Sequence, residues 1–184
     1  MDLHILVTFA ANWELMVSLA SLVIAICAIC VSVWQGIQTR KHNQISVTPH
    51  LTTWVETEAK KNKYTIELMN NGIGPAVIDS FSLCVDGKEI KSESSKKIGL
   101  ALKILFPNND YKEYHSWFGN KYVMAKDEKR SLLDIIFLGP NAPSSEKVLK
   151  NIERSSLKII YRSMYDKFFV LETKGMKTIT SGQL

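Results

Sequence analysis

The chain has 184 residues, with 23 Lys and Arg, 18 Asp and Glu and a formal net charge of +5. This length predicts one folded domain beside any membrane segment. The three cysteines exclude a disulfide framework in the folded part, because two lie in a charge-free apolar stretch and Cys84 stands alone. Such cysteine usage is typical of a protein in a reducing compartment.

The charge-free stretch extends from Leu15 to Thr39 and contains no Asp, Glu, Lys, Arg or His. As a helix it is about 37 Å long, and the hydrocarbon core of a bilayer is about 30 Å thick. Trp13 and Trp34 bracket its most apolar part, as indole rings do at membrane interfaces. The sequence therefore predicts a transmembrane helix over about residues 15–36, within an N-terminal segment of residues 1–39. A cleaved signal peptide fits less well, because no Lys or Arg precedes the stretch.

Charges on the two sides of the predicted span differ in sign. Arg40 and Lys41 follow it directly, whereas Asp2 and Glu14 precede its charge-free core. The positive-inside rule then places residues 40–184 in the cytoplasm and the N-terminus outside. We therefore expect a single-pass protein of the inner (cell) membrane, with the lipid bilayer as a partner.

Small residues recur along the predicted span at spacings of 3, 4, 3 and 4, and form a seam: Ser18, Ser21, Ala25, Ala28 and Ser32. These are the spacings of the a and d positions in a left-handed coil, and small side chains let helices approach closely in lipid. The seam predicts a homo-oligomer, and a shared axis lined by the serine hydroxyls makes a pore a further hypothesis. The alternative is that Ala and Ser, which are common in spans, fall into register by chance.

Beyond a basic linker over residues 40–46, the hydrophobic period changes from helical to alternating. Alternation of apolar and polar residues is typical of half-buried strands. It predicts strands over residues 47–57, 64–69, 77–85, 88–91, 121–125, 131–138, 156–165 and 167–173. This density of short strands indicates a mainly β fold, in which the transmembrane helix is followed by an antiparallel β-sandwich over residues 47–173.

Helices and irregular segments complete the prediction. A helix is expected over residues 144–154, capped by Ser144 or Ser145, so that the sandwich carries one or two short helices. Residues 94–105 fit either a helix or a strand. An aromatic loop is predicted over residues 108–120 and a frayed tail over residues 174–184.

Two turns are marked by their residue types. Asp86-Gly87 is the strongest hairpin signal in the chain. The stretch Asn70-Asn71-Gly72-Ile73-Gly74-Pro75-Ala76 carries two glycines and a proline, which favours a turn with positive-φ positions.

The string Asn70-x-Gly72-x-Gly74-Pro75-Ala76, together with Ile159-x-Tyr161-x-Ser163-x-Tyr165, resembles a broad set of small bacterial membrane proteins. These have one N-terminal span and a cytoplasmic immunoglobulin-like β-sandwich. The resemblance implies this fold for most of residues 45–173, with the first string joining two core strands. It implies little about activity. Some members of such architectures look like effectors in bacterial anti-phage defence, which is an analogy of architecture.

Motifs predict no catalytic, metal or cofactor site. The sequence contains no GxxxxGK[ST] phosphate loop, no GxSxG nucleophile elbow and no HExxH metal motif. His50 and His115 fall within the folded part, and neither has a ligand pattern nearby. Asp134 is interpreted as a satisfied carboxylate, or as a site carboxylate paired with Arg130 or Arg162. We therefore expect a protein that is not an enzyme, with an unrecognised site assembled from distant residues as a third hypothesis.

Basic residues are the candidate ligand contacts. Lys158 and Arg162 point to one face of their strand because side chains alternate, and Arg154 precedes them. Lys96, Lys97 and Lys103 form a second basic group, and Lys60, Lys61 and Lys63 form a third. An anionic ligand such as a nucleotide would bind these cations, with base stacking from Tyr111, Tyr114, Trp117 and Phe118. The alternative is that the cations solvate the outer face of the sheet and the aromatic residues cover the core.

These patterns favour a membrane-anchored cytoplasmic binding or sensor module that oligomerises through its span. In its strongest form the ligand is an anionic nucleotide signal, and binding rearranges the spans to perturb the membrane, as an effector of anti-phage defence would. The alternative is an accessory or docking subunit of a larger membrane protein complex, with the sandwich as the platform for a partner membrane protein.

Overall fold

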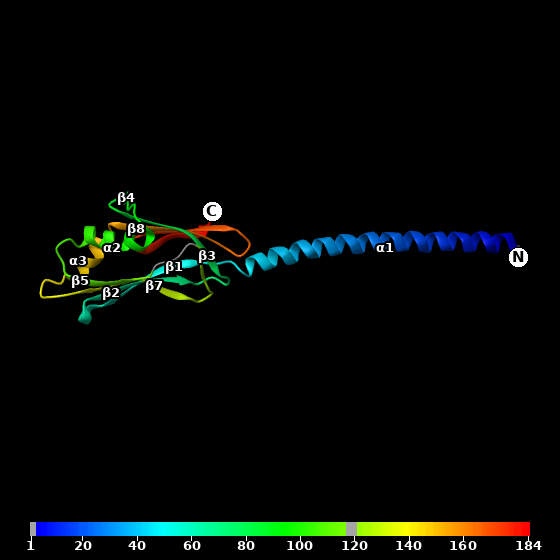
Figure 1. Ribbon diagram of the computed structural model, residues 1–184. Helices are drawn as coiled ribbons and strands as arrows, with labels where there is room; N and C mark the ends of the chain where they lie inside the picture. The colour runs from blue at the N-terminus through cyan, green and yellow to red at the C-terminus, as the bar shows by residue number, and fades with distance from the viewer. Residues whose placement is uncertain (1–2, 117–120) are drawn as a thin grey trace. The chain divides into compact units, whose positions relative to one another are not determined.

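The computed structural model describes residues 3–116 and 121–184 (Figure 1). It divides into two compact units, Met1–Ile45 and Ser46–Leu184. The first unit is one helix, and the second, which we call the β unit, contains the strands. The predicted fold class is confirmed in outline: the protein is mainly β, its described strands form two antiparallel sheets, and an apolar helix lies at the N-terminus.

Helix α1 runs from Leu3 to Ile45. Its segment Trp13–Ile45 is long and apolar enough to cross a membrane, and it is the one such segment in the described part of the chain. The linker predicted over residues 40–46 is instead almost entirely the end of this helix, because no Gly or Pro occurs between Gly36 and Pro49. The Leu, Ile and Val side chains of the segment are exposed. An apolar surface of this extent is unfavourable in water, so it is expected to contact lipid or another protein.

The two sheets differ in size and order. Sheet A has the order β1-β2-β7-β5, with bounds Leu51–Glu58, Lys63–Asn70, Lys129–Phe137 and Tyr111–His115. Sheet B has the order β10-β9-β8-β3-β4, with bounds Lys177–Gln183, Phe168–Lys174, Ser155–Arg162, Ala76–Val85 and Lys88–Glu89. Strand β6 (Tyr122–Met124) pairs with β3. The helices η1, α2 and α3 have the bounds Ala59–Lys61, Ser94–Leu105 and Ser145–Ile152.

Inner-face side chains of both sheets form one hydrophobic core. The alternation predicted from the sequence is confirmed on β2, where the buried apolar residues are Tyr64, Ile66 and Leu68. The same alternation on β8 buries Leu157, Ile159 and Tyr161. Burial of such side chains is the dominant favourable contribution to folding.

Residues 94–105, which fit either structure by sequence, form helix α2. Ile98, Leu102 and Leu105 are all buried. They lie four and three residues apart, so one face of a helix carries all three, whereas a strand would divide them between its two faces. The helix predicted over residues 144–154 is present as α3, and the Ser144 hydroxyl caps it.

Two segments predicted as irregular contain strands. Strand β5 lies inside the predicted loop 108–120, and its side chains alternate between half-buried and exposed. Strand β10 lies inside the predicted tail 174–184. The chain reverses at Gly175 and Met176, which both have positive φ, and β10 therefore pairs with β9. Neither strand is strongly apolar, so backbone pairing with a neighbour stabilises each of them more than burial does.

Strand β10 also joins the edges of the two sheets. The N–H of Thr53 on β1 donates to the Thr178 hydroxyl at 3.2 Å, and the Thr53 hydroxyl donates to the Met176 carbonyl at 2.6 Å. The Ser181 hydroxyl donates to the Leu51 carbonyl at 2.7 Å. These bonds occupy backbone groups at an edge that would otherwise be open to a strand from another chain.

The turn predicted at residues 70–76 holds the first residues of the β unit. The side chain of Asn70 is fully buried. Its Oδ1 accepts the N–H groups of His50 and Gly72 at 3.2 and 3.1 Å. Its Nδ2 donates at 2.9, 3.3 and 3.1 Å to the carbonyls of Gly74, Met124 and Ala125. One side chain therefore satisfies backbone groups from three separate segments.

The positive φ predicted for this turn is wrong, because neither Gly72 nor Gly74 has it. The two glycines instead permit a close backbone approach. A Cβ at Gly72 would lie 2.3 Å from the His50 nitrogen, and a Cβ at Gly74 would lie 2.1 Å from the Val47 oxygen. We call the arrangement of Asn70, Gly72 and Gly74 on residues 47–50 the Asn70 clamp. It explains why β1 begins at Leu51 rather than at residue 47 as predicted: the preceding residues pack on the turn.

Candidate functional site

The predicted basic residues do not share one site. Lys96 and Lys97 both lie on α2. The amine of Lys96 pairs with Glu93 at 3.0 Å, and the amine of Lys97 donates to the Phe81 carbonyl at 3.1 Å. Each of the two amines therefore has a partner close to α2, and neither lines the groove that contains the cations of β8.

Arg162 lies at the end of β8 that is distant from Arg154. Its Nε lies 3.4 Å from Asp79 Oδ2, and its Nη1 pairs with Asp166. Strand alternation predicts that Lys158 and Arg162 share one face of the strand, and the burial pattern of β8 agrees with that. Four residues of strand separate them by about 13 Å, however, so they belong to different parts of the surface.

Arg154 and Lys158 do lie together, in a groove on the outer face of sheet B that we call the outer groove. It has a volume of about 450 Å³, within the range of about 300–1,000 Å³ that small-molecule sites occupy. Its polar lining comprises Glu153, Arg154, Ser155, Ser156, Lys158, Glu172, Thr173 and Lys174. The apolar side chain of Ile179 lies at its margin.

The register of β8 and β9 positions these side chains. Lys158 lies opposite Glu172, and Ser156 lies opposite Lys174. Because side chains two residues apart on a strand share a face, Lys158 and Lys174 are diagonal neighbours within reach of one small ligand.

Two ion pairs occupy cations of the groove. The Arg154 guanidinium forms a fork on Asp86, with Nε–Oδ1 at 2.8 Å and Nη2–Oδ2 at 2.5 Å. Hydrogen bonding to this guanidinium holds the pKa of the Asp86 carboxyl below its usual value. The Lys158 amine pairs with Glu172 at 2.7 Å. All four side chains are close to half exposed, and exposed pairs contribute little stability, so a stronger anion can displace the carboxylates.

Lys174 is a groove residue that the sequence analysis missed. Its side-chain amine makes no ion pair or hydrogen bond within the described part of the chain. The residue stood at the first position of the predicted tail, whereas the structure continues β9 to it. If the predicted strand had been extended by one residue, alternation would have placed Lys174 on the same face as Glu172.

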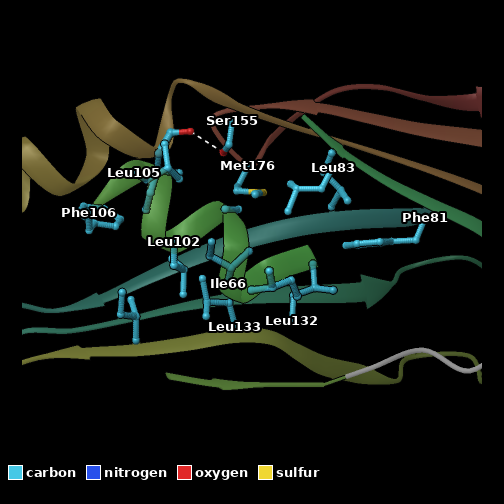
Figure 2. Close-up of a pocket in the computed structure, with 15 residues that line it drawn as sticks. Ile66, Phe81, Leu83, Leu102, Leu105, Phe106, Leu132, Leu133, Ser155 and Met176 are labelled. Carbon is cyan, nitrogen blue, oxygen red and sulfur yellow. Dashed lines mark hydrogen bonds between the residues drawn. The ribbon is translucent and has the colours of Figure 1, made fainter. Parts of the chain in front are cut away.

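A second recess lies in the interior, between the sheets and beneath α2 (Figure 2). It is a cavity of about 40 Å³, lined by Leu102 and Leu105 of α2, by Ile66, Leu132 and Leu133 of sheet A and by Leu83 of sheet B, among others. Ser155 is its polar neighbour, and the Ser155 hydroxyl donates to the Ile152 carbonyl at 2.6 Å. An apolar void of this kind stays dry and cannot hold a charged ligand.

Neither recess assembles recognisable catalytic chemistry. Among the described residues, no group of three His, Cys, Asp or Glu side chains is placed to hold a metal ion. No protein-family model, curated protein or solved structure matches the chain. The site must therefore be interpreted from its own geometry.

The predicted partners of Asp134 are wrong. Asp134 accepts hydrogen bonds from the hydroxyls of Thr65 and Ser131 at 2.6 and 2.9 Å, and Lys63 lies 3.9 Å away. Arg130 instead bonds Glu128 at 2.9 Å. The interpretation of Asp134 as a satisfied carboxylate is confirmed.

The two described residues of the predicted aromatic platform are not near the outer groove. Tyr111 and Tyr114 lie on β5 in sheet A, whereas the groove lies on sheet B. Tyr111 packs edge-to-face on Phe137, with ring centroids 6.1 Å apart. Burial and the nearby Glu113 raise the pKa of Tyr111. Trp117 and Phe118 lie outside the described residues.

The predicted seam lies on an exposed surface of α1. The hydroxyls of Ser18, Ser21 and Ser32 each donate to the carbonyl four residues earlier, at 2.8 Å. The serines therefore need no partner to satisfy their hydrogen bonds, and a helix packed on the seam would meet small, internally bonded side chains.

Proposed function

We propose that the protein is a membrane-anchored binding module whose β unit takes a small phosphate-bearing anion in the outer groove. The observation that carries this proposal is the convergence of Arg154, Lys158 and Lys174 on one recess of suitable volume. Arginine offers a planar fork to a phosphate, and the two amines add charge without fixed geometry. A nucleotide signal is the expected ligand class, and Ile179 offers its base an apolar contact.

The anchor in this proposal is α1. Its apolar segment has the length of a span, and Arg40 and Lys41 follow the charge-free core. By the positive-inside rule the β unit would lie in the cytoplasm, in a single pass through the inner membrane with the N-terminus outside.

We further propose that the β unit has an immunoglobulin-like fold. The orders β1-β2-β7-β5 and β3-β8-β9 correspond to the A-B-E-D and C-F-G sheets of that fold. This agrees with the family resemblance of the Asn70 turn and the C-terminal tyrosine pattern. Strand β10 would then be an addition that extends the C-F-G sheet.

The groove is tested by removing its amines. In the variant Lys158→Gln/Lys174→Gln we expect the affinity for ATP, used as the probe, to fall at least tenfold, about 1.4 kcal/mol. In Glu172→Gln, which releases Lys158 from its ion pair, we expect tighter binding. Isothermal titration of the detergent-solubilised full chain with ATP without magnesium measures both effects.

The matched control for this experiment is Lys96→Gln/Lys103→Gln, which removes the same charge from α2. It should leave the affinity within a factor of two. Absence of ATP binding to the unchanged protein, or equal losses in both double variants, would contradict the groove. Co-purification of a stoichiometric membrane protein would favour the docking-subunit alternative.

The proposal also includes assembly through the seam, by which a bound signal would rearrange the spans and perturb the membrane as a defence effector does. We expect Ser21→Leu/Ala25→Leu/Ala28→Leu to lower the oligomeric mass in detergent, because leucines keep helix backbones apart. Light scattering after gel filtration measures the mass. Val23→Leu/Ile24→Leu/Ile29→Leu, which lies off the seam, is the control. An unchanged mass in the seam variant would rule the seam out.

A further inference from the structure

We propose that one end of the β unit rests on the phospholipid headgroups of the membrane that α1 spans. This end, which we call the tethered end, is the one at which the chain arrives from α1. The proposal rests on the anchor of the proposed function and goes beyond it, because it assigns a lipid-contacting surface to the β unit itself.

Six large apolar side chains lie exposed at the tethered end: Ile73, Val123, Met164, Tyr165, Phe168 and Leu184. Their exposed fractions lie between 48% and 68%. Other exposed apolar residues of the β unit, such as Trp54, Leu100 and Leu149, are distributed over β1, α2 and α3. A group of apolar side chains confined to one end of a unit marks an interaction surface.

Strand register places the first members of this group in one row across sheet B. Val123 lies opposite Val77, Val77 lies opposite Arg162, and Arg162 lies opposite Phe168. The backbone N–H of Leu184 continues the row by donating to the Phe168 carbonyl at 3.0 Å.

The remaining members lie in the turns that project beyond this row. Met164 and Tyr165 belong to the turn between β8 and β9, and Ile73 belongs to the turn before β3. That second turn is part of the Asn70 clamp, so the apolar group adjoins residues 47–50, the first of the β unit. The N–H groups of Ile73 and Gly74 both donate to the Thr48 carbonyl, at 3.0 and 3.3 Å.

The length of the tether brings this end close to the bilayer. The predicted span ends near residue 36, and helix α1 continues to Ile45. Nine residues of helix measure about 14 Å, and the headgroup layer itself extends about 5–7 Å from the hydrocarbon core. Helix α1 therefore ends within about 10 Å of the headgroups, and the first residues held by the Asn70 clamp follow it after Ser46.

The chemistry of this end suits a phospholipid surface. Lys121 and Lys126 are exposed there, and amines close to an anionic leaflet are attracted to it. Two exposed carboxylates at the same end are already paired with cations of the β unit: Asp127 lies 3.9 Å from Lys126, and Asp166 pairs with Arg162. Tyr165 combines an apolar ring with a hydroxyl, as side chains at membrane interfaces do. A protein partner on the same surface is the competing occupant, and the experiment below distinguishes it.

The test uses the full chain in nanodiscs of phosphatidylcholine and phosphatidylglycerol. One cysteine carries an environment-sensitive nitrobenzoxadiazole dye, and the native cysteines are replaced by alanine. With headgroup-spin-labelled lipid we expect the dye at M164C to be quenched at least three times more strongly than the dye at L138C. Leu138 is also apolar and exposed, at 40% against 61% for Met164, but it follows β7 at the opposite end of the β unit.

A third labelling site separates the two proposals. In this third protein the dye is attached to native Cys27, and the other cysteines are replaced. Quenching of this dye by acyl-chain-spin-labelled lipid reports that the span is inserted in the bilayer. If Cys27 is not quenched, the anchor fails, and the present inference fails with it. If Cys27 is quenched while M164C and L138C respond equally, the tethered end does not touch lipid and only the present inference is overturned. A signal at M164C that depends on protein concentration and not on spin-labelled lipid identifies a second copy, and also overturns it.

Removing apolar side chains gives an independent readout. We expect Ile73→Ser/Phe168→Ser to reduce headgroup quenching at M164C by at least half. The matched variant Leu100→Ser/Ile104→Ser removes comparable exposed side chains from α2, beside Val85 and Asp86, and should leave the quenching unchanged. Equal effects of the two variants would contradict the lipid contact.

Discussion

Replacement of Asn70 by alanine is expected to lower the free energy of unfolding of the β unit by about 4 kcal/mol. The substitution leaves the N–H groups of His50 and Gly72 and three carbonyls without the amide that bonds them. Each buried polar group that loses its partner costs about 1–3 kcal/mol, and partial entry of water returns some of that sum. Urea unfolding of the detergent-solubilised protein, followed by near-ultraviolet circular dichroism, measures the change.

Two further substitutions serve as comparisons for Asn70→Ala. Asn71→Ala removes an exposed amide that bonds the Thr52 hydroxyl, and should change stability by less than about 0.5 kcal/mol. Asn70→Asp keeps an acceptor for His50 and Gly72 but loses the three donated bonds, so it should be about as harmful as alanine. A loss below about 1 kcal/mol in Asn70→Ala would show that water replaces the amide and that the clamp contributes little.

Gly74→Ala is expected to prevent the β unit from reaching its folded state. The new Cβ would lie 2.1 Å from the Val47 oxygen, and Gly72→Ala would place one 2.3 Å from the His50 nitrogen. Both distances are far below van der Waals contact, and the atoms met are backbone atoms, which cannot rotate away as a side chain can. The yield of protease-resistant protein in detergent measures the effect.

The control for the glycine variants is Gly182→Ala on β10. A Cβ at that position meets no atom within 4 Å, so the yield should be unchanged. Normal yields of Gly72→Ala and Gly74→Ala, with unchanged urea midpoints, would contradict the close approach of the two backbone segments.

Local patterns made much of the fold predictable. Alternation located β2 and β8, because the large apolar side chains of each strand are buried on one face and the period of two is imposed by the pleat. Strands β3 and β9 were also located, although each buries three consecutive residues and so departs from strict alternation. The Asp86-Gly87 hairpin followed from residue types that tolerate positive φ, and both residues have it. Strands β5 and β10 were missed because their conformation depends on pairing with a partner strand rather than on their own apolar periodicity.

The candidate site was less predictable than the fold. Strand alternation put Lys158 and Arg162 on one face, but alternation does not show where a surface is recessed. The carboxylates that occupy the cations come from other segments: Asp86 lies 68 residues before Arg154 along the chain. Such partners are set by strand order, which the sequence alone did not specify. The Asn70 motif was recognised as a turn, whereas its role in holding residues 47–50 needed the structure.

The Asn70 clamp also leaves only a short connection between α1 and the first held residue of the β unit. Only Ser46 and Val47 lie between Ile45, where α1 ends, and Thr48, whose carbonyl is bound by the clamp. The three Cα–Cα steps from Ile45 to Thr48 span at most about 11 Å. If spans associate through the seam, their helix axes lie about 8–10 Å apart, and each β unit is confined beside its neighbour at a high effective concentration. Under that confinement, contacts between β units too weak to detect between freely diffusing molecules would be populated, and a ligand that alters them would act on the assembly as a whole.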